Sequence, residues 1–220
     1  MTFFTGKSEC NQEINFKFNN LFHRFPSLEV CKEDIWQAFL LLKETFMQSG
    51  KLLVCGNGGS ASDSDHIVGE LMKGFKLDRK IPDDIREKIK SMNDGDYISD
   101  KLQGGLPAIS LVSQTALTSA IGNDIATDMV FAQQVYAYAK PNDCFCGIST
   151  SGNAKNVLYA AQVAKAMDMK VIALTGQTGG ALQDICDIVI KAPSLITFEI
   201  QEYHLPIYHQ ICMMIEDEFF

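Results

Sequence analysis

The stretch KLLVCGNGGSASDSDHIVGEL, residues 51–71, joins a short apolar run to a glycine-rich turn and then to a polar, helix-like segment. The run Leu52, Leu53, Val54 and Cys55 shows no polar alternation, which is typical of a strand buried on both faces of a parallel sheet. Glycines and serines follow at once, as they do where a strand turns into a helix. The stretch therefore predicts one strand–turn–helix unit of an α/β fold.

The same alternation continues along the chain. Further strand-like apolar runs lie at residues 106–113, 143–150, 170–176 and 187–193. Helix-like stretches lie at about residues 33–48, 61–74, 115–138 (interrupted near Gly122), 154–167, 180–185 and 197–220, where Pro206 is expected to kink the helix or to mark its first turn. The pattern predicts a three-layer α/β sandwich, in which a five-stranded parallel sheet is flanked by helices.

Length and composition predict one globular domain over residues 1–220, with an N-terminal helical segment at residues 1–49. The net charge of -8 argues against a nucleic-acid partner, which would require a clustered basic face. No apolar run is long enough to span a bilayer, and the first residues lack the basic-then-apolar pattern of a signal peptide. We therefore expect neither a nucleic-acid nor a membrane partner.

The seven cysteines form no CxxC pair and no disulfide-like framework. Cys55, Cys144 and Cys146 lie in strand-like apolar runs, where buried free thiols are expected. Free thiols are typical of a reducing compartment, so we expect a cytoplasmic location.

Residues 76–105 interrupt the regular alternation, because they are charged and polar and separate a helix from the next strand. A structureless connection of that length is uncommon in a compact domain, so we expect short helices around residues 83–92 and 96–103. Two interpretations remain open for this polar insertion: a solvated surface excursion, or a cover over an active site.

Two strand-to-helix junctions hold the polar groups expected of a ligand site. The first spans residues 55–62, and the second, at residues 147–156, offers the successive hydroxyls of Ser149, Thr150 and Ser151. Hydroxyls and unpaired amides at a helix N-terminus bind phosphate, although each loop alone also fits ordinary turn and capping chemistry. Two such loops on one sheet favour a phosphorylated ligand, and neither is a Walker sequence.

Two further segments carry candidate metal or acid–base groups. His66 and Glu70 are four residues apart and share one face of a helix, where they could bind a divalent metal or form an incidental surface pair. Gln201 and His209 are eight residues apart, about 80° around an ideal helix, so they converge on one site if that helix bends. For His204 and His209 the alternative is packing and hydrogen bonding against the core.

The order of these segments resembles the sugar isomerase domain family and, within it, the phosphoheptose isomerases. The resemblance runs from about residue 30 to the end, and it rests on CGNGGSASDSDHIVGEL (55–71), AIGND (120–124), GISTSGNAKNV (147–157), VIALTG (171–176) and EIQEYHLPIYH (199–209). It implies a parallel five-stranded sheet flanked by helices. It also implies a homotetramer whose active sites are shared between subunits.

The resemblance implies a role for each matching residue. The sugar would contact Asn57, Gly58, Gly59, Ser60, Asn123 and Asp124, and the phosphate would bind to Ser149, Thr150 and Ser151. One zinc ion per subunit would be held by His66, Glu70, Gln201 and His209. The implied enzyme is an intramolecular oxidoreductase that converts sedoheptulose 7-phosphate to a heptose 7-phosphate through an enediolate, with Glu70 as base and His209 as acid.

Three positions depart from the family pattern. Ala154 stands where the family often has serine, Lys73-Gly74 where it commonly has Gly-Arg, and Glu199 where it commonly has arginine. These changes leave the metal and acid–base residues intact and bear mainly on which sugar phosphate is bound. Two other functions remain open, a non-catalytic regulator that binds sugar phosphates and a protein-interaction member of the same fold. The complete His/Glu/Gln/His set favours an enzyme.

Overall fold

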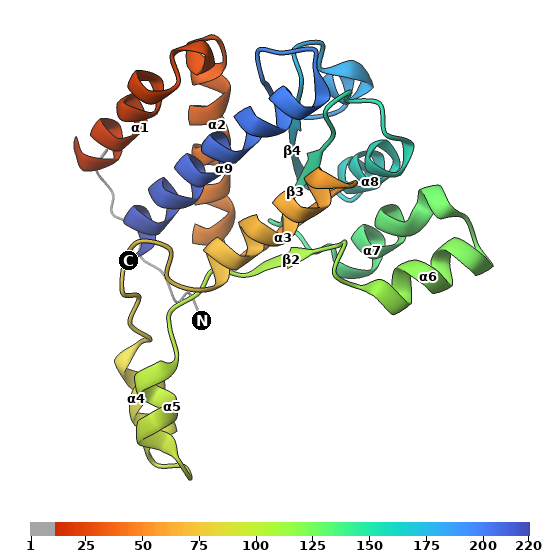
Figure 1. Ribbon diagram of the computed structural model, residues 1–220. Helices are drawn as coiled ribbons and strands as arrows, with labels where there is room; N and C mark the ends of the chain where they lie inside the picture. Colours follow the sequence, from red (N-terminus) through yellow and green to blue (C-terminus); the bar gives the residue numbers. More distant parts are fainter. Residues whose placement is uncertain (1–11) are drawn as a thin grey trace.

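The computed structural model describes residues 12–220, and its centre is a five-stranded parallel sheet (Figure 1). The strands are β1 (Leu52–Gly56), β2 (Ala108–Ser110), β3 (Cys144–Ile148), β4 (Lys170–Thr175) and β5 (Ile188–Lys191). They pair in parallel in the order β2-β1-β3-β4-β5. The predicted sheet is thereby confirmed.

Helices cover both faces of this sheet (Figure 1). On one face lie α1 (Gln12–Arg24), the 3-10 helix η1 (Pro26–Cys31), α2 (Lys32–Met47), α3 (Gly59–Met72) and α9 (Thr197–Phe219). On the other lie α6 (Thr115–Asp124), η2 (Thr127–Met129), α7 (Val130–Tyr138), α8 (Lys155–Ala166) and η3 (Gly180–Asp184). The predicted three-layer sandwich is confirmed, whereas the part of the N-terminal segment before residue 12 lies outside the described residues.

The strand sequences explain the two hydrophobic layers. Leu52 and Val54 pack into the cluster under α2, α3 and α9, whereas Leu53 and Cys55 pack into the cluster under α7 and α8. Successive side chains of a strand point to opposite faces, so an unbroken apolar run serves both layers. Each fully buried aliphatic side chain contributes roughly 1.5–3 kcal/mol, which makes β1 an anchor for the loop that follows it.

The boundaries differ from the prediction in three places. The helical stretch 115–138 is interrupted near Gly122 as predicted, but the break lies at Ile125 and Ala126, and Gly122 itself stays helical. Pro206 lies inside α9, which continues from residue 197 to residue 219. Residues 180–184 form a 3-10 helix.

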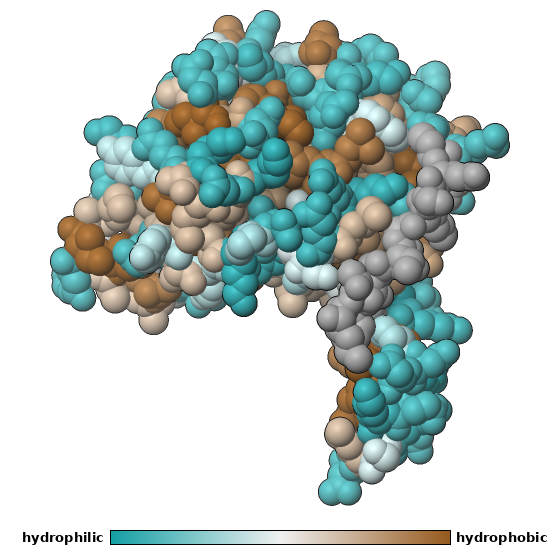
Figure 2. Space-filling model, turned by 180° about the vertical axis from the view of Figure 1, so that it is seen from behind, coloured by the Kyte–Doolittle hydropathy of each residue, from teal (hydrophilic) through white to brown (hydrophobic). Residues whose placement is uncertain are grey.

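The polar insertion forms two helices, α4 (Asp83–Lys90) and α5 (Gly95–Lys101), close to the predicted positions. They pack on each other as a hairpin that projects from the body, with a mostly hydrophilic surface (Figures 1 and 2). The hairpin follows the C-terminal end of α3, and the predicted phosphate loops lie at its N-terminal end. Within this chain the insertion is therefore a surface excursion and does not cover those loops.

Two further features concern the cysteines and the apolar character of the helices. The described cysteines, Cys31, Cys55, Cys144, Cys146, Cys186 and Cys212, are all free thiols. Burial raises the pKa of the Cys55 thiol well above its usual value, so it behaves as a small apolar group. Within residues 12–220, no helix combines the length and the apolar character that crossing a bilayer requires.

Candidate active site

The two predicted phosphate loops meet at the point where the strand order reverses. Strand β2 pairs with one edge of β1, and the chain then crosses over so that β3 pairs with the other edge. Ligands of open α/β sheets bind in the crevice at such a switch point. The side-chain amides of Asn57 and Asn156 each donate to the other's oxygen at 2.9 Å. This reciprocal pair ties the loop after β1 to the start of α8.

The loop after β1 requires glycine at one position and packs closely against Gln201 at the next. Gly58 has a φ of 56°, in the left-handed region that favours glycine. A Cβ atom on Gly59 would lie 2.6 Å from the side-chain nitrogen of Gln201. The helix α3 begins here without a side-chain cap, and Ser60 is buried beneath the turn. The N–H groups of Ser60 and Ala61 donate to Asn57 O and Gly58 O at 3.0 Å, so the turn is held by its own backbone.

The loop after β3 presents its three hydroxyls on a backbone held by the neighbouring strand. The N–H of Ser149 donates to Leu174 O at 3.0 Å, and Thr150 O accepts from the N–H of Gly176 at 2.9 Å. Ser149 is buried and Ser151 is exposed. The helix α8 begins at Ala154 without a side-chain cap. The predicted phosphate residues are therefore brought beside the loop after β1, as the hypothesis requires.

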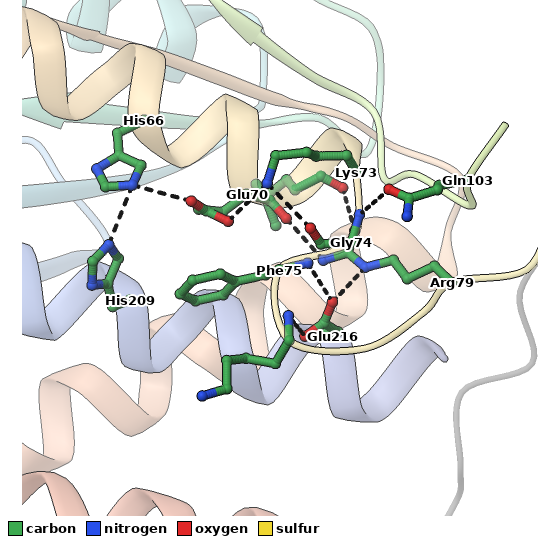
Figure 3. Close-up of polar contacts among 11 residues, drawn as sticks. His66, Glu70, Lys73, Gly74, Phe75, Arg79, Gln103, His209 and Glu216 are labelled. Carbon is green, nitrogen blue, oxygen red and sulfur yellow. Dashed lines mark hydrogen bonds and ion pairs between the residues drawn. The ribbon is translucent and has the colours of Figure 1, made fainter. Parts of the chain in front are cut away.

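A second polar group lies two turns along α3 (Figure 3). The Nε2 atom of His66 is 3.1 Å from Glu70 Oε1 and 3.4 Å from His209 Nε2. Glu70 is buried, and its other oxygen is 3.4 Å from Lys73 Nζ. Burial, followed by the nearby His66, lowers the pKa of His209, and Glu70 opposes part of this shift. The structure thus joins three of the four predicted metal ligands, including both predicted catalytic residues.

The other nitrogen of His66 contacts Tyr208, which in turn contacts Asp63, and the sequence analysis predicted a role for neither residue. Its Nδ1 atom is 3.0 Å from the hydroxyl of Tyr208, which donates to Asp63 Oδ1 at 3.2 Å. Tyr208 is only 3% exposed. The positions of these residues offered a signal, because Asp63 precedes His66 by three residues and Tyr208 precedes His209 directly.

Gln201 does not join the other three predicted ligands within this chain. Its side chain packs against Gly59, at the N-terminal end of α3. The helix α9 runs without interruption through Pro206, and eight residues of helix place Gln201 about 12 Å along the axis from His209. The two side chains therefore lie at different levels of the helix.

The donor types around His66 fit zinc, although the described residues do not form a complete site. Zinc binds imidazole nitrogen and carboxylate oxygen at about 2.0–2.2 Å, so ligand atoms in a tetrahedral site lie about 3.3 Å apart. The His66–Glu70 and His66–His209 distances, 3.1 and 3.4 Å, are close to this value. No group of three or more His, Cys, Asp or Glu side chains in residues 12–220 is already arranged around a metal position. A small movement or a further donor is needed.

Asn123 and Asp124 lie at the C-terminal end of α6, where both side chains are exposed. The amide of Asn123 donates to Asp124 Oδ1 at 2.7 Å. The short helix η2 that follows packs against α8, which keeps the pair on the same side of the sheet as the second loop. Their role as sugar contacts stays a prediction.

A buried ion pair holds the C-terminal end of α3 (Figure 3). The fully buried guanidinium of Arg79 donates to Glu216 Oε1 at 2.7 Å, to Leu71 O at 2.7 Å and to Glu70 O at 2.8 Å. Burial would raise the pKa of Glu216, but hydrogen bonds from two backbone N–H groups and from Arg79 lower it overall. A cation bonded to the last carbonyls of a helix complements its dipole. Arg79 therefore fixes the turn that carries Glu70.

His204 packs and hydrogen-bonds against the core, as one interpretation of the sequence predicted, whereas His209 belongs to the polar cluster. The Nε2 atom of His204 is 3.1 Å from Thr175 O, at the end of β4, and the side chain is fully buried. Burial lowers the pKa of His204 to about 4, so the ring is a neutral donor that ties α9 to the sheet. His209 instead faces His66.

Comparisons with known proteins show which family this chain belongs to. The family model of the SIS domain, the sugar isomerase domain, matches residues 102–176. The phosphoheptose isomerase of Helicobacter pylori is 41% identical over 193 residues, which cover 88% of each chain. That of Aliarcobacter butzleri is 38% identical over 191 residues, 87% of this chain and 88% of the relative. The solved phosphoheptose isomerase of Francisella tularensis superposes with a TM-score of 0.74 at 32% identity, over 94% of this chain and 97% of that one.

The five-stranded parallel sheet and the matched segment place the chain among the sugar isomerase domain proteins. Relatives of this identity and coverage narrow the assignment further. The chain belongs to the phosphoheptose isomerase family, as the sequence resemblance predicted.

Proposed function

We propose that this chain interconverts sedoheptulose 7-phosphate and a heptose 7-phosphate. One observation carries the proposal: the Asn57–Asn156 pair ties the two loops together, and α3 joins them to the acid–base cluster at His66, seven residues or about 10 Å from Gly59. An extended seven-carbon chain with bonds of about 1.5 Å places its first two carbons on the order of 10 Å from a phosphate on the seventh.

The described residues supply the groups that the isomerisation needs. Glu70 removes a proton from C1 of the ketose and returns it to C2 of the enediolate. His209 supplies a proton to the C2 oxygen and takes up the proton of the C1 hydroxyl as the aldehyde forms, so it ends the reaction in its starting state. Asn57 and the hydroxyls of the second loop hold the substrate across the switch point. Burial of Glu70 keeps water from competing for the proton.

We propose one zinc ion per subunit, held by His66, Glu70 and His209. When bound, the ion would polarise the two substrate oxygens that exchange protons. The support is the donor set itself, two imidazoles and a carboxylate within 3.4 Å of His66 Nε2. In this proposal Gln201, the fourth predicted ligand, comes from another copy of the chain, because its own helix holds it beside Gly59.

We propose a homotetramer with shared active sites. Large apolar side chains are exposed where α9 begins, beside the carboxyl ends of the strands: Leu195 is 71% exposed, Ile196 49% and Phe198 61%. Contiguous apolar surface of this kind marks interaction sites. Sedimentation of the purified protein tests the assembly, and a monomer at micromolar concentration contradicts it. The free thiols support a reducing cytoplasm as the place of action.

The test of the function is conversion of sedoheptulose 7-phosphate by the wild-type protein, by Glu70→Gln and by His209→Ala. General acid–base groups contribute about 10²–10⁴-fold, so each variant should lose activity by that factor while staying folded. Glu87→Gln, on the exposed face of the α4–α5 hairpin, is the matched control. If the wild-type protein binds the sugar phosphate but does not convert it, the non-catalytic regulator is favoured instead. A variant that keeps more than about half of the wild-type activity would remove the substituted residue from the mechanism.

A further inference from the structure

Tyr208 lies between a carboxylate and an imidazole, both within hydrogen-bonding distance. Its hydroxyl is 3.2 Å from Asp63 Oδ1 and 3.0 Å from His66 Nδ1. The side chain is 97% buried from solvent, and buried phenol groups are normally hydrogen-bonded. The single phenol proton goes to one neighbour, and its direction decides the protonation pattern of His66.

The carboxylate decides that direction. An ionised aspartate only accepts hydrogen bonds, whereas the phenol oxygen both donates and accepts. Among the described residues Asp63 Oδ2 is buried without a partner, so Tyr208 is the donor on which the carboxylate depends. Turning the proton to His66 would strip the carboxylate of this bond, which costs about 1–3 kcal/mol for a buried group. The phenol oxygen is then left to accept from the Nδ1–H of His66.

We infer that Tyr208 and Asp63 are positioning residues that fix His66 in the tautomer with its proton on Nδ1. A neutral imidazole protonated there has its lone pair on Nε2. That atom lies 3.1 Å from Glu70 Oε1 and 3.4 Å from His209 Nε2. A proton on Nε2 would instead be donated to Glu70, but Glu70 also has Lys73 Nζ at 3.4 Å, whereas Asp63 has no donor besides Tyr208 among the described residues. The hydrogen bonds that join Asp63, Tyr208 and His66 thus leave the Nε2 lone pair where the proposed function needs a metal ligand. The assignment of Nε2 as a metal ligand rests on the proposed function, whereas the tautomer does not.

His209, which follows Tyr208 in the sequence, also holds the His66 ring in place. Tyr208 and His209 are consecutive on α9, and their rings contact the His66 ring edge-on at 5.5 and 4.8 Å between centroids. One helix therefore addresses both nitrogens of one imidazole, Nδ1 through Tyr208 and Nε2 through His209. The ring cannot flip without losing the Tyr208 hydrogen bond.

The tautomer is measurable without metal or substrate. In protein labelled with ¹⁵N-histidine at pH 8, the ring correlations of His66, assigned by their loss in His66→Gln, should show the proton on Nδ1. His204 provides an internal reference of the opposite kind, because its Nε2–H donates to Thr175 O. Tyr208→Phe and Asp63→Asn should both release His66 into a mixture of tautomers while the His204 signals stay unchanged.

Zinc binding supplies a second readout. Loss of an outer hydrogen-bond partner typically weakens metal affinity 10–100-fold, so Tyr208→Phe should bind zinc at least about tenfold more weakly. The matched control Tyr203→Phe, on the same helix, should bind as the wild type does. A wild-type His66 protonated on Nε2, or an unchanged tautomer in both variants, overturns the inference. A wild-type protein with the expected tautomer but no isomerisation would refute the proposed function alone.

Discussion

Acid should destabilise the fold through one buried histidine, His204. Its ring is completely buried, its Nε2–H donates to Thr175 O, and its Nδ1 atom has no partner among the described residues. Protonation would add a charge and an unpaired N–H to this position. Burial therefore lowers the pKa of His204 from 6.5 to about 4, and the hydrogen bond to Thr175 opposes only part of the shift.

The size of the effect follows from proton linkage. The unfolded chain takes up a proton at His204 below about pH 6.5, whereas the folded chain does so only near pH 4. This contribution to stability is complete above pH 6.5 and is lost as the pH falls toward 4. At 1.36 kcal/mol per pKa unit, the loss is about 2 kcal/mol between pH 7.5 and pH 5 and about 3 kcal/mol by pH 4.

The assay compares urea unfolding of the wild-type protein and His204→Gln at pH 7.5, 6 and 5, at one protein concentration. Glutamine keeps a donor for Thr175 O but does not titrate. His209, whose pKa is also lowered, contributes equally to both proteins, so it cancels in the difference. The stability advantage of the wild type should shrink by about 2 kcal/mol over this range. Parallel curves, with a difference constant to within about 0.5 kcal/mol, would refute the reasoning.

Three further predictions concern the ion pair, the phosphate loop and the metal. Glu216→Gln leaves the guanidinium of Arg79 buried without its counter-charge, so the free energy of unfolding should fall by about 3 kcal/mol, whereas a loss below about 1 kcal/mol contradicts this. Ser151→Ala should weaken phosphosugar binding about tenfold and leave metal content unchanged; unchanged binding in every combination of the three hydroxyl variants argues against a phosphate site. A chelator should abolish activity with little change in the unfolding midpoint, and added zinc should restore the activity. Full activity in protein that holds well under one metal ion per chain would remove the metal from the mechanism.

Short-range patterns in the sequence were enough to predict the strands of the sheet and the loops that follow them. The apolar run of β1 and the glycines after it predicted a strand–turn–helix unit, and the structure has one at residues 52–72. The hydroxyls after β3 were placed correctly for the same reason, since loops at the carboxyl ends of neighbouring parallel strands lie together. His66 and Glu70 share a face because four residues span about one helical turn.

Only the tertiary structure decided how α9 lies against α3. Its position along α3 brings His209 to His66 and leaves Gln201 beside Gly59, so the two residues meet different turns of α3. The same packing pairs Tyr208 with Asp63 and Arg79 with Glu216, residues between 137 and 145 positions apart in the chain. Periodicity specifies which face of a helix is buried, but it carries no information about the offset between two helices. That offset is set by how the side chains of the whole layer pack.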